Sequence, residues 1–411
     1  MTGPVSADPL EGVLLDGRYL VETTIATGGM STVYRGMDTR LDRPVALKVM
    51  DSRYAGDKQF LTRFQLEARA VARLKNPGLV DIYDQGTDGR HPFLVMELVE
   101  GGTLRELLRE RGPMPPHAVA AVLRPVLGGL AAAHRNGLVH RDVKPENVLI
   151  SDQGEVKLVD FGLVRAVAEA GITSTSVILG TAAYLSPEQV ASGTSDPRSD
   201  VYSAGILAYE LLTGATPFTG DTALAVAYQR MDNDVAPPSS RIDGVPAPLD
   251  EFVLRATSRD PARRYADAAD MAADLDRIAG ELNLPVFRVP APRNSAQHAS
   301  AVLHHSRVHD QQATVKHPRP ATSVPTTSVP APSGNAARHP TRAFTRGQDD
   351  WDGSDHPPPA GKFAGIELDQ FAVARARARR TTAIWVAVML ILTGAVAAAG
   401  WALGSNLTSL L

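Results

Sequence analysis

The feature that most constrains the fold of this chain is the stretch VHRDVKPENVLI, residues 139–150. It places Asp142, Lys144 and Asn147 between an apolar run with helical spacing and a short apolar run typical of a strand. Eighteen residues after Asp142, the stretch LVDFG places Asp160 at the end of another strand-like run. A charged surface loop could hold one such cluster, but two clusters at this separation indicate a single site.

These side chains suit the transfer of a phosphoryl group from a nucleotide to a hydroxyl. That reaction needs a carboxylate beside the attacking oxygen and ligands for the metal ion that neutralises the phosphates. Asp142 would orient the hydroxyl and accept its proton, and Lys144 would stabilise charge on the transferred group. Asn147 and Asp160 would bind Mg²⁺ or Mn²⁺, because hard cations prefer oxygen ligands.

A lysine in a strand-like run supplies a further candidate. Lys48 lies within VALKVM, where a buried ammonium group would be costly without a partner. Glu67, in the helical segment 59–74, could provide the carboxylate. Taken alone, Lys48 fits an exposed strand lysine better, but the polar motifs that follow favour a catalytic Lys48–Glu67 pair.

The stretch IATGGMSTVYRG, residues 25–36, is a candidate phosphate loop. In a G-x-G-x-x-G-x-V loop the three glycine positions would be Ala26, Gly28 and Ser31, so one glycine is kept. A hairpin that binds nothing is the alternative, but the polar residues described above favour the loop, which would act through backbone N–H groups. We expect Ala26 to alter nucleotide affinity modestly without loss of activity.

With these motifs in this order, the chain resembles the bacterial Hanks-type (eukaryotic-like) serine/threonine protein kinases of the membrane-anchored Pkn group. The resemblance covers residues 19–280, after an N-terminal segment of residues 1–18. It implies an α+β, bilobal protein-kinase fold with a β-rich N-lobe and a helical C-lobe, and ATP as the phosphoryl donor. Later markers of the family are also present: Ser186-Pro187-Glu188, Asp200, Gly205, and Arg264, which the family pairs with Glu188. The S-P-E segment favours a protein as acceptor, and Lys144 favours serine and threonine over tyrosine.

The resemblance further implies which residues contact ATP. Met96 would be the gatekeeper behind the adenine, and backbone groups of Glu97 and Val99 would hydrogen-bond the purine edge. The complete expected set is Ile25, Ala26, Thr27, Gly28, Gly29, Met30, Ser31, Thr32, Val33, Ala46, Lys48, Met96, Glu97, Val99 and Leu149.

Two threonines between Asp160 and Glu188 are the expected autophosphorylation sites, by alignment with the family. Thr173 and Thr175 belong to the run TSTS, which could otherwise be a solvated loop. Arg141, beside Asp142, would need an anion if it is partly buried, and a phosphothreonine would supply one. The alternative to an active kinase is a pseudokinase scaffold that binds nucleotide without transferring phosphate.

The family also forms back-to-back dimers through its N-lobes. The corresponding positions are Arg18, Leu41 and Asp84, which makes a homodimer a further expected assembly. The formal net charge of −3 gives no indication of nucleic-acid binding. The absence of cysteine excludes disulfides, zinc–thiolate sites and thiol catalysis.

The C-terminal part of the chain has a different composition. Residues 286–370 are rich in Pro, Ser, Thr, His and Arg, which predicts a disordered linker. Residues 383–403 carry no charge and would span the roughly 30 Å core of a bilayer as one helix. The arginines that precede this span place the kinase domain in the cytoplasm, with the tail 404–411 outside, and could also contact anionic lipids. The sequence therefore predicts a single-pass protein of the cell membrane.

Overall fold

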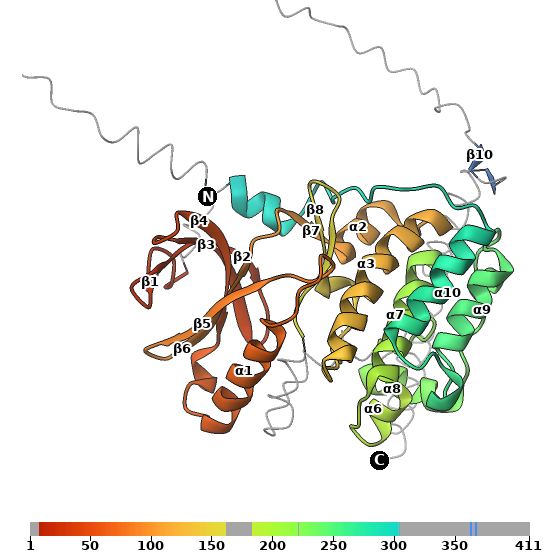
Figure 1. The fold of residues 1–411 in the computed structure, drawn as a ribbon, viewed down its shortest axis with the longest axis horizontal. Helices are drawn as coiled ribbons and strands as arrows, with labels where there is room; N and C mark the ends of the chain where they lie inside the picture. Colours follow the sequence, from red (N-terminus) through yellow and green to blue (C-terminus); the bar gives the residue numbers. More distant parts are fainter. Residues whose placement is uncertain are drawn as a thin grey trace, which may run out of the picture. The chain divides into compact units, whose positions relative to one another are not determined.

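The computed structural model describes residues 8–161, 183–220, 222–302 and 304, and two short strands at residues 362–363 and 366–367. The first of these regions begins with a β-rich lobe, and a helical lobe follows it (Figure 1). The bilobal architecture expected from the sequence is confirmed.

The N-lobe is built on a six-stranded antiparallel sheet with the order β1-β2-β3-β4-β6-β5. Its strands are β1 (Leu14–Leu15), β2 (Tyr19–Thr27), β3 (Ser31–Asp38), β4 (Arg43–Met50), β5 (Ile82–Asp88) and β6 (His91–Glu97). The central strand β4 is buried on both faces, since Val45 and Leu47 belong to one apolar cluster and Ala46 to another.

Helix α1 (Lys58–Val71) packs against this sheet through residues at helical spacing. Its buried side chains are Phe60, Phe64, Ala68 and Val71. The helix begins where the Asp57 carboxylate accepts two backbone N–H groups, a cap that stabilises a helix by about 1 kcal/mol. The 3₁₀ turn η1 (Ser52–Tyr54) connects β4 to this helix.

The C-lobe is built around α7, which is buried from residue 199 to residue 212. Its helices are α2 (Leu104–Arg111), α3 (Pro116–Arg135), α6 (Pro187–Ala191), α7 (Pro197–Thr213), α8 (Ala223–Asp232), α9 (Ala247–Ala256) and α10 (Ala268–Glu281). Its 3₁₀ turns are η2 (Pro145–Asn147), η3 (Pro238–Ser240) and η4 (Pro261–Arg263). A small sheet with the order β7-β8-β9 faces the N-lobe, with strands β7 (Gly101–Thr103), β8 (Val148–Ser151) and β9 (Val156–Leu158). The catalytic motifs therefore flank the strands of this sheet.

The segment after α10 differs from the sequence-based expectation. Residues 285–302, which we call the strap, run back over the C-lobe toward the N-lobe and end in a short helix that starts at residue 296 (Figure 1). The predicted linker starts at residue 286, so its first part is corrected: it is packed on the kinase domain. Composition misled here because a few buried side chains, such as Val289, Ser295 and Ser300, hold a segment that is otherwise polar.

The remaining C-terminal features are mostly outside the described residues. Strands β10 (Lys362–Phe363) and β11 (Ile366–Glu367) form an antiparallel pair within the predicted linker. Within the described regions, α3 alone has the length and hydropathy of a membrane span, and it is largely buried in the C-lobe. The span predicted at residues 383–403 lies outside the described residues.

Candidate active site

The loop that carries Asp142 is anchored by the buried carboxylate of Asp200 on α7. The backbone N–H groups of His140 and Arg141 each donate to Asp200 at 2.7 Å, and His134 Nε2 lies 2.9 Å from the same side chain. His140 is fully buried, and this burial lowers the pKa of its imidazole. Asp200 thus fixes the entry of the loop through charge-assisted hydrogen bonds.

Two residues of the site adopt a left-handed backbone conformation. The φ angle is 69° at Arg141 and 67° at Asp160, a region that side-chain-bearing residues seldom occupy. Such conformations persist where the surroundings enforce them, and they concentrate at functional sites. They turn the chain directly before Asp142 and at Asp160.

Asp142 is held by two of the residues predicted to act with it. Its Oδ2 accepts a hydrogen bond from Asn147 Nδ2 at 2.9 Å and lies 2.8 Å from Lys144 Nζ. Its other oxygen, Oδ1, is buried and accepts no hydrogen bond from the described part of the chain. One carboxylate oxygen therefore orients the side chain, and the other is left to accept a proton.

Lys48 and Asp160 join the two lobes through an ion pair. Lys48 Nζ on β4 lies 2.7 Å from Asp160 Oδ1, and the lysine side chain is almost fully buried. Burial alone would raise the pKa of the Asp160 carboxyl, but the charge and hydrogen bond of Lys48 outweigh it and lower that pKa. The carboxylate is therefore ionised at neutral pH.

The partner predicted for Lys48 was Glu67, and here the structure differs. The ion pair described for Lys48 is with Asp160, whereas Glu67 on α1 lines a cavity of about 100 Å³ together with Arg141 and Phe161. Each lobe supplies one candidate carboxylate, Glu67 in the N-lobe and Asp160 in the C-lobe. Lys48 forms its ion pair with Asp160. Sequence order alone could not distinguish between them.

The residues predicted to bind a divalent cation offer a suitable donor set. Asn147 uses its Nδ2 to donate to both the backbone oxygen and Oδ2 of Asp142, which leaves its amide oxygen as a ligand. Asp160 adds an ionised carboxylate that is partly exposed to the cleft. Two hard oxygen donors beside a proton acceptor fit Mg²⁺ or Mn²⁺ with a nucleotide triphosphate.

The candidate phosphate loop is the turn between β2 and β3. Ala26 pairs with Val33 and Thr27 with Thr32, and the Gly28 N–H donates to the Ser31 carbonyl at 2.9 Å. The residues from 26 to 29 are exposed, as a loop that covers a ligand requires. The β3 strand that follows pairs Val33 with Lys48, so the loop and the lysine share one sheet.

Several of the residues predicted to contact ATP belong to, or pack against, one apolar cluster. Ala46 and Met96 are buried in it, and Val33, Val99 and Leu149 pack against it partly exposed. Behind Met96 lies a small cavity of about 20 Å³ lined in part by Leu94, Asp160 and Phe161. Glu97 is held by Lys157, whose Nζ donates to its Oε1 at 2.6 Å. These members of the predicted set come from both lobes, since Ala46 and Met96 belong to the N-lobe sheet and Leu149 to the C-lobe sheet.

Of the remaining predicted positions, some are among the described residues and some are not. Thr173 and Thr175 lie outside the described residues. Arg141, the expected phosphate partner, has a buried Nε with no hydrogen-bond partner in the described regions. Arg18 pairs within the same chain, with Asp38 at 2.7 Å and Asp84 at 3.3 Å, and Leu41 is exposed.

The ion pair between Glu188 and Arg264 has the geometry the sequence analysis expected. Two guanidinium nitrogens lie 2.8 and 2.9 Å from the two carboxylate oxygens, and Ser199 Oγ adds a third hydrogen bond at 2.7 Å. Burial opposes the ionisation of Glu188, but Arg264 overcomes it and lowers the pKa of the carboxyl to about 2.

Sequence reasoning missed a second ionic network beside the catalytic loop. Arg105 on α2 donates to Glu146 at 2.7 Å, to Glu210 on α7 at 2.6 Å and to the Tyr184 hydroxyl at 2.6 Å. Burial opposes the charge of Arg105, but Glu210 and its neighbours outweigh it and raise the pKa of the guanidinium. The charged partners are 41 and 105 residues away in the chain, so no local pattern signals them.

Comparison with known proteins agrees with this geometry. The protein kinase domain family matches residues 19–274. The serine/threonine-protein kinase PknL of Mycobacterium tuberculosis is 66% identical over 410 residues, and the match covers 98% of this chain and 98% of PknL. PknB of the same organism is 45% identical over 270 residues, 64% of this chain and 43% of PknB. A crystal structure of the M. tuberculosis PknI kinase domain superimposes with a TM-score of 0.52 at 28% identity, covering 65% of this chain and 98% of that one. The chain thus belongs to the protein kinase family and is a serine/threonine protein kinase.

Proposed function

We propose that this kinase is anchored in the membrane, transfers the γ-phosphoryl group of ATP to protein serine and threonine hydroxyls, and is activated by autophosphorylation at Thr173 and Thr175. The observation that carries the proposal is the proximity of two polar pairs, Lys48 with Asp160 at 2.7 Å and Asn147 with Asp142 at 2.9 Å. The backbone joins them, because the Val159 N–H donates to the Asn147 carbonyl at 2.9 Å. When bound, ATP and its divalent cation would supply the phosphoryl group and neutralise its charge.

Each polar side chain has a separate task in this proposal. The buried ammonium of Lys48 would bind phosphate oxygens, a role suited to a cation already held rigidly by Asp160. Asn147 and Asp160 would hold the cation through their oxygens. The free Oδ1 of Asp142 would accept the proton of the attacking hydroxyl, while Lys144 would stabilise the negative charge that moves with the phosphoryl group.

A transfer assay tests the chemistry. The full chain, Mg²⁺ and γ-labelled ATP are incubated with a library of peptides whose acceptors are serine, threonine or tyrosine. We expect label on serine and threonine, and its loss in Asp142→Asn, which keeps the size of the side chain but cannot accept the proton. Nucleotide binding without transfer in the unaltered chain would instead indicate a scaffold.

Regulation by the loop between Asp160 and Glu188 has its own support. Arg141 presents a buried Nε without a partner in the described regions, next to the residue that accepts the proton. A phosphothreonine would provide charge and oxygens for that group. Replacement of Thr173 and Thr175 by alanine should lower the activation gained on preincubation with Mg-ATP. The matched control replaces Ser174 and Ser176, and equal losses in both variants would refute the assignment.

Membrane anchoring is supported by the uncharged run 383–403 and the arginines before it. The full chain should remain in membranes after an alkaline carbonate wash, and a chain that ends at residue 382 should be released. Release of both proteins would contradict the proposed span.

A further inference from the structure

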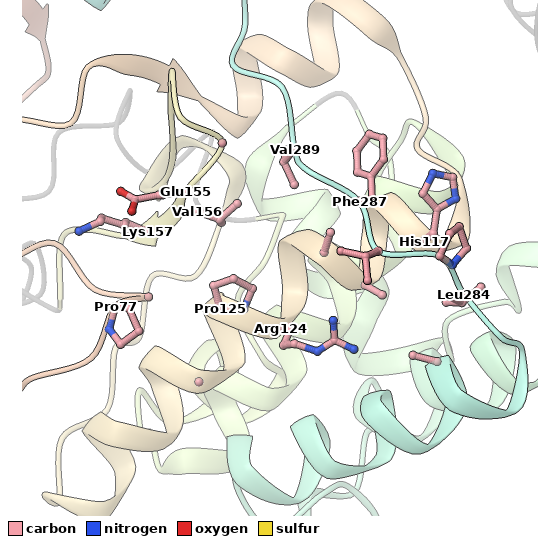
Figure 2. Close-up of a pocket in the computed structure, with 18 of the residues that line it drawn as sticks. Pro77, His117, Arg124, Pro125, Glu155, Val156, Lys157, Leu284, Phe287 and Val289 are labelled. Atoms are coloured by element: carbon pink, nitrogen blue, oxygen red, sulfur yellow. The ribbon is translucent and has the colours of Figure 1, made fainter.

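The strap crosses three parts of the kinase domain in succession. Its first residues pass over α3, where the Phe287 ring meets the His117 ring edge-on at 4.9 Å and Val289 is buried in the C-lobe core. A cavity of about 650 Å³ lies beneath this part, with Leu284, Phe287 and Val289 on one side and Pro125 on the other (Figure 2). Phe287 and Val289 thus attach this part of the strap to the C-lobe, although a cavity remains beside them.

The second part of the strap is fastened at the connection between the lobes. Ser295 Oγ donates to the Gly101 carbonyl at 2.5 Å, and the Ala296 N–H donates to Glu106 at 2.9 Å. The Arg293 N–H donates to Glu110 at 2.7 Å. These bonds join the strap to β7 and α2, which directly follow the residues predicted to bind adenine.

The last part of the strap reaches the N-lobe. The Ser300 hydroxyl lies 2.7 Å from the Thr23 hydroxyl, and both residues are only 2% exposed. His304 lies 3.6 Å from Glu22 on the same strand. Thr23 lies on β2, two residues before Ile25, where the phosphate loop begins. The C-terminal end of the strap thus holds the strand that leads into this loop.

Two glycines make room for the strap. A Cβ atom at Gly102 would lie 2.4 Å from Pro292 and 2.6 Å from Ser295. A Cβ atom at Gly154, in the β8–β9 turn, would lie 2.5 Å from Arg288. All three separations are far below the van der Waals contact distance, so any larger residue would push against the strap. The kinase domain is therefore shaped to receive it.

From these contacts we infer that the strap is a working part of the catalytic domain. Ser300 is a positioning residue that fixes β2, and with it the phosphate loop, over the nucleotide, while Ser295 fastens the strap to β7. The strap contacts neither Asp142 nor Asn147 in the described residues. Its loss should therefore weaken nucleotide binding and leave the transfer step intact. The inference depends on ATP as the bound nucleotide, as proposed above.

Single substitutions in the full chain give the first test. Ser300→Ala leaves the buried Thr23 hydroxyl without its partner, so the Kd for ATP should rise about threefold to tenfold, the value of one buried hydrogen bond. The kcat should stay within about twofold, because binding that is equal in ground and transition states changes KM alone. Ser300→Thr keeps a hydroxyl and should restore most of the affinity. Gly102→Ala should weaken ATP binding in the same way.

A reversible cross-link gives the sharper test, because the chain contains no cysteine. Thr23→Cys combined with Ser300→Cys replaces two hydroxyls 2.7 Å apart, close enough for a disulfide after a small adjustment. When oxidised, the double variant should bind ATP as the unaltered chain does. When reduced, the same molecules should show the raised Kd. The matched control is Val302→Ala, an exposed position of the same helix.

The nucleotide Kd separates this inference from the proposed function, because it is measured without turnover. An unaltered chain that binds ATP but transfers no phosphate would refute the proposed function. The strap inference would still be decided by the ATP Kd of the strap variants. An unchanged Kd in Ser300→Ala and in the reduced double variant would overturn the strap inference. A lower melting temperature together with an unchanged Kd would also overturn it, since the strap would then only add stability.

Discussion

Lys48 Nζ and Asp160 Oδ1 lie 2.7 Å apart and form an ion pair that joins the two lobes. One partner belongs to the central strand of the N-lobe sheet, and the other follows the last strand of the C-lobe sheet. The pair therefore brings the predicted phosphate-binding cation next to a predicted metal ligand.

Replacement of Lys48 by methionine should remove this cation while filling nearly the same volume. We expect kcat/KM for ATP to fall at least about a hundredfold, the usual effect of deleting one group that stabilises the transition state. Steady-state phosphorylation of a serine-containing peptide measures it. The control is Lys75→Met, because Lys75 is exposed and forms a surface pair with the half-exposed carboxylate of Asp81. A similar loss in both variants would contradict the role of Lys48.

Asp200 should be as important for the geometry of the catalytic loop as for stability. Asp200→Ala removes the acceptor of two N–H groups and of His134, so the free energy of unfolding should fall by about 3 kcal/mol and kcat should also fall. Urea unfolding and initial rates report the two effects. Asp276→Ala, in an exposed pair with Arg124, should cost under about 1 kcal/mol and leave kcat unchanged.

The pair of Glu188 and Arg264 should affect how the free energy of unfolding changes with pH under acidic conditions. The folded-state pKa of Glu188, about 2, lies below its ordinary value of 4.5, so the unfolded chain binds more protons. The contribution of the pair is fully present above pH 4.5 and is lost as the pH falls toward 2. Glu188→Gln should flatten the fall of unfolding free energy across this window. Denaturant unfolding at several pH values measures the slope, and an unchanged slope would contradict the assignment.

Arg105 should be costly to remove because its loss leaves Glu210 buried without a counter-ion. Arg105→Met should destabilise the kinase by about 3 kcal/mol or more. Arg124→Met, which breaks an exposed pair, is the matched control and should cost under about 1 kcal/mol. If Glu210→Gln is added to Arg105→Met, part of the lost stability should return, because the buried charge is removed. Additive losses would argue against a direct coupling between the two residues.

The sequence predicted those parts of the site whose reactive side chains lie close together in one short motif. Asp142, Lys144 and Asn147 lie within six residues, and a 3₁₀ turn brings them into contact. The apolar run around Lys48 left an exposed lysine open, and the polar motifs that follow favoured a buried, paired one; the lysine is buried. Such features follow from spacing and residue type, which a single sequence displays.

The features that the sequence did not predict depend on distant partners. The pairing of Lys48 with Asp160 rather than Glu67 depends on the distance between two lobes. The Arg105–Glu210 pair joins residues on separate helices, and the bond between Thr23 and Ser300 spans 277 positions. The composition of the strap indicated disorder, because composition averages over the few buried residues that fix it.

The most direct measurement of the central claim is the intact mass of the purified full chain before and after incubation with Mg-ATP. We predict that the unaltered chain gains phosphate, and that Asp142→Asn, which binds ATP with a similar Kd, gains none. Equal phosphate gain by both proteins would contradict the account, because the proton acceptor would then lie elsewhere than the Asp142–Asn147–Asp160 site.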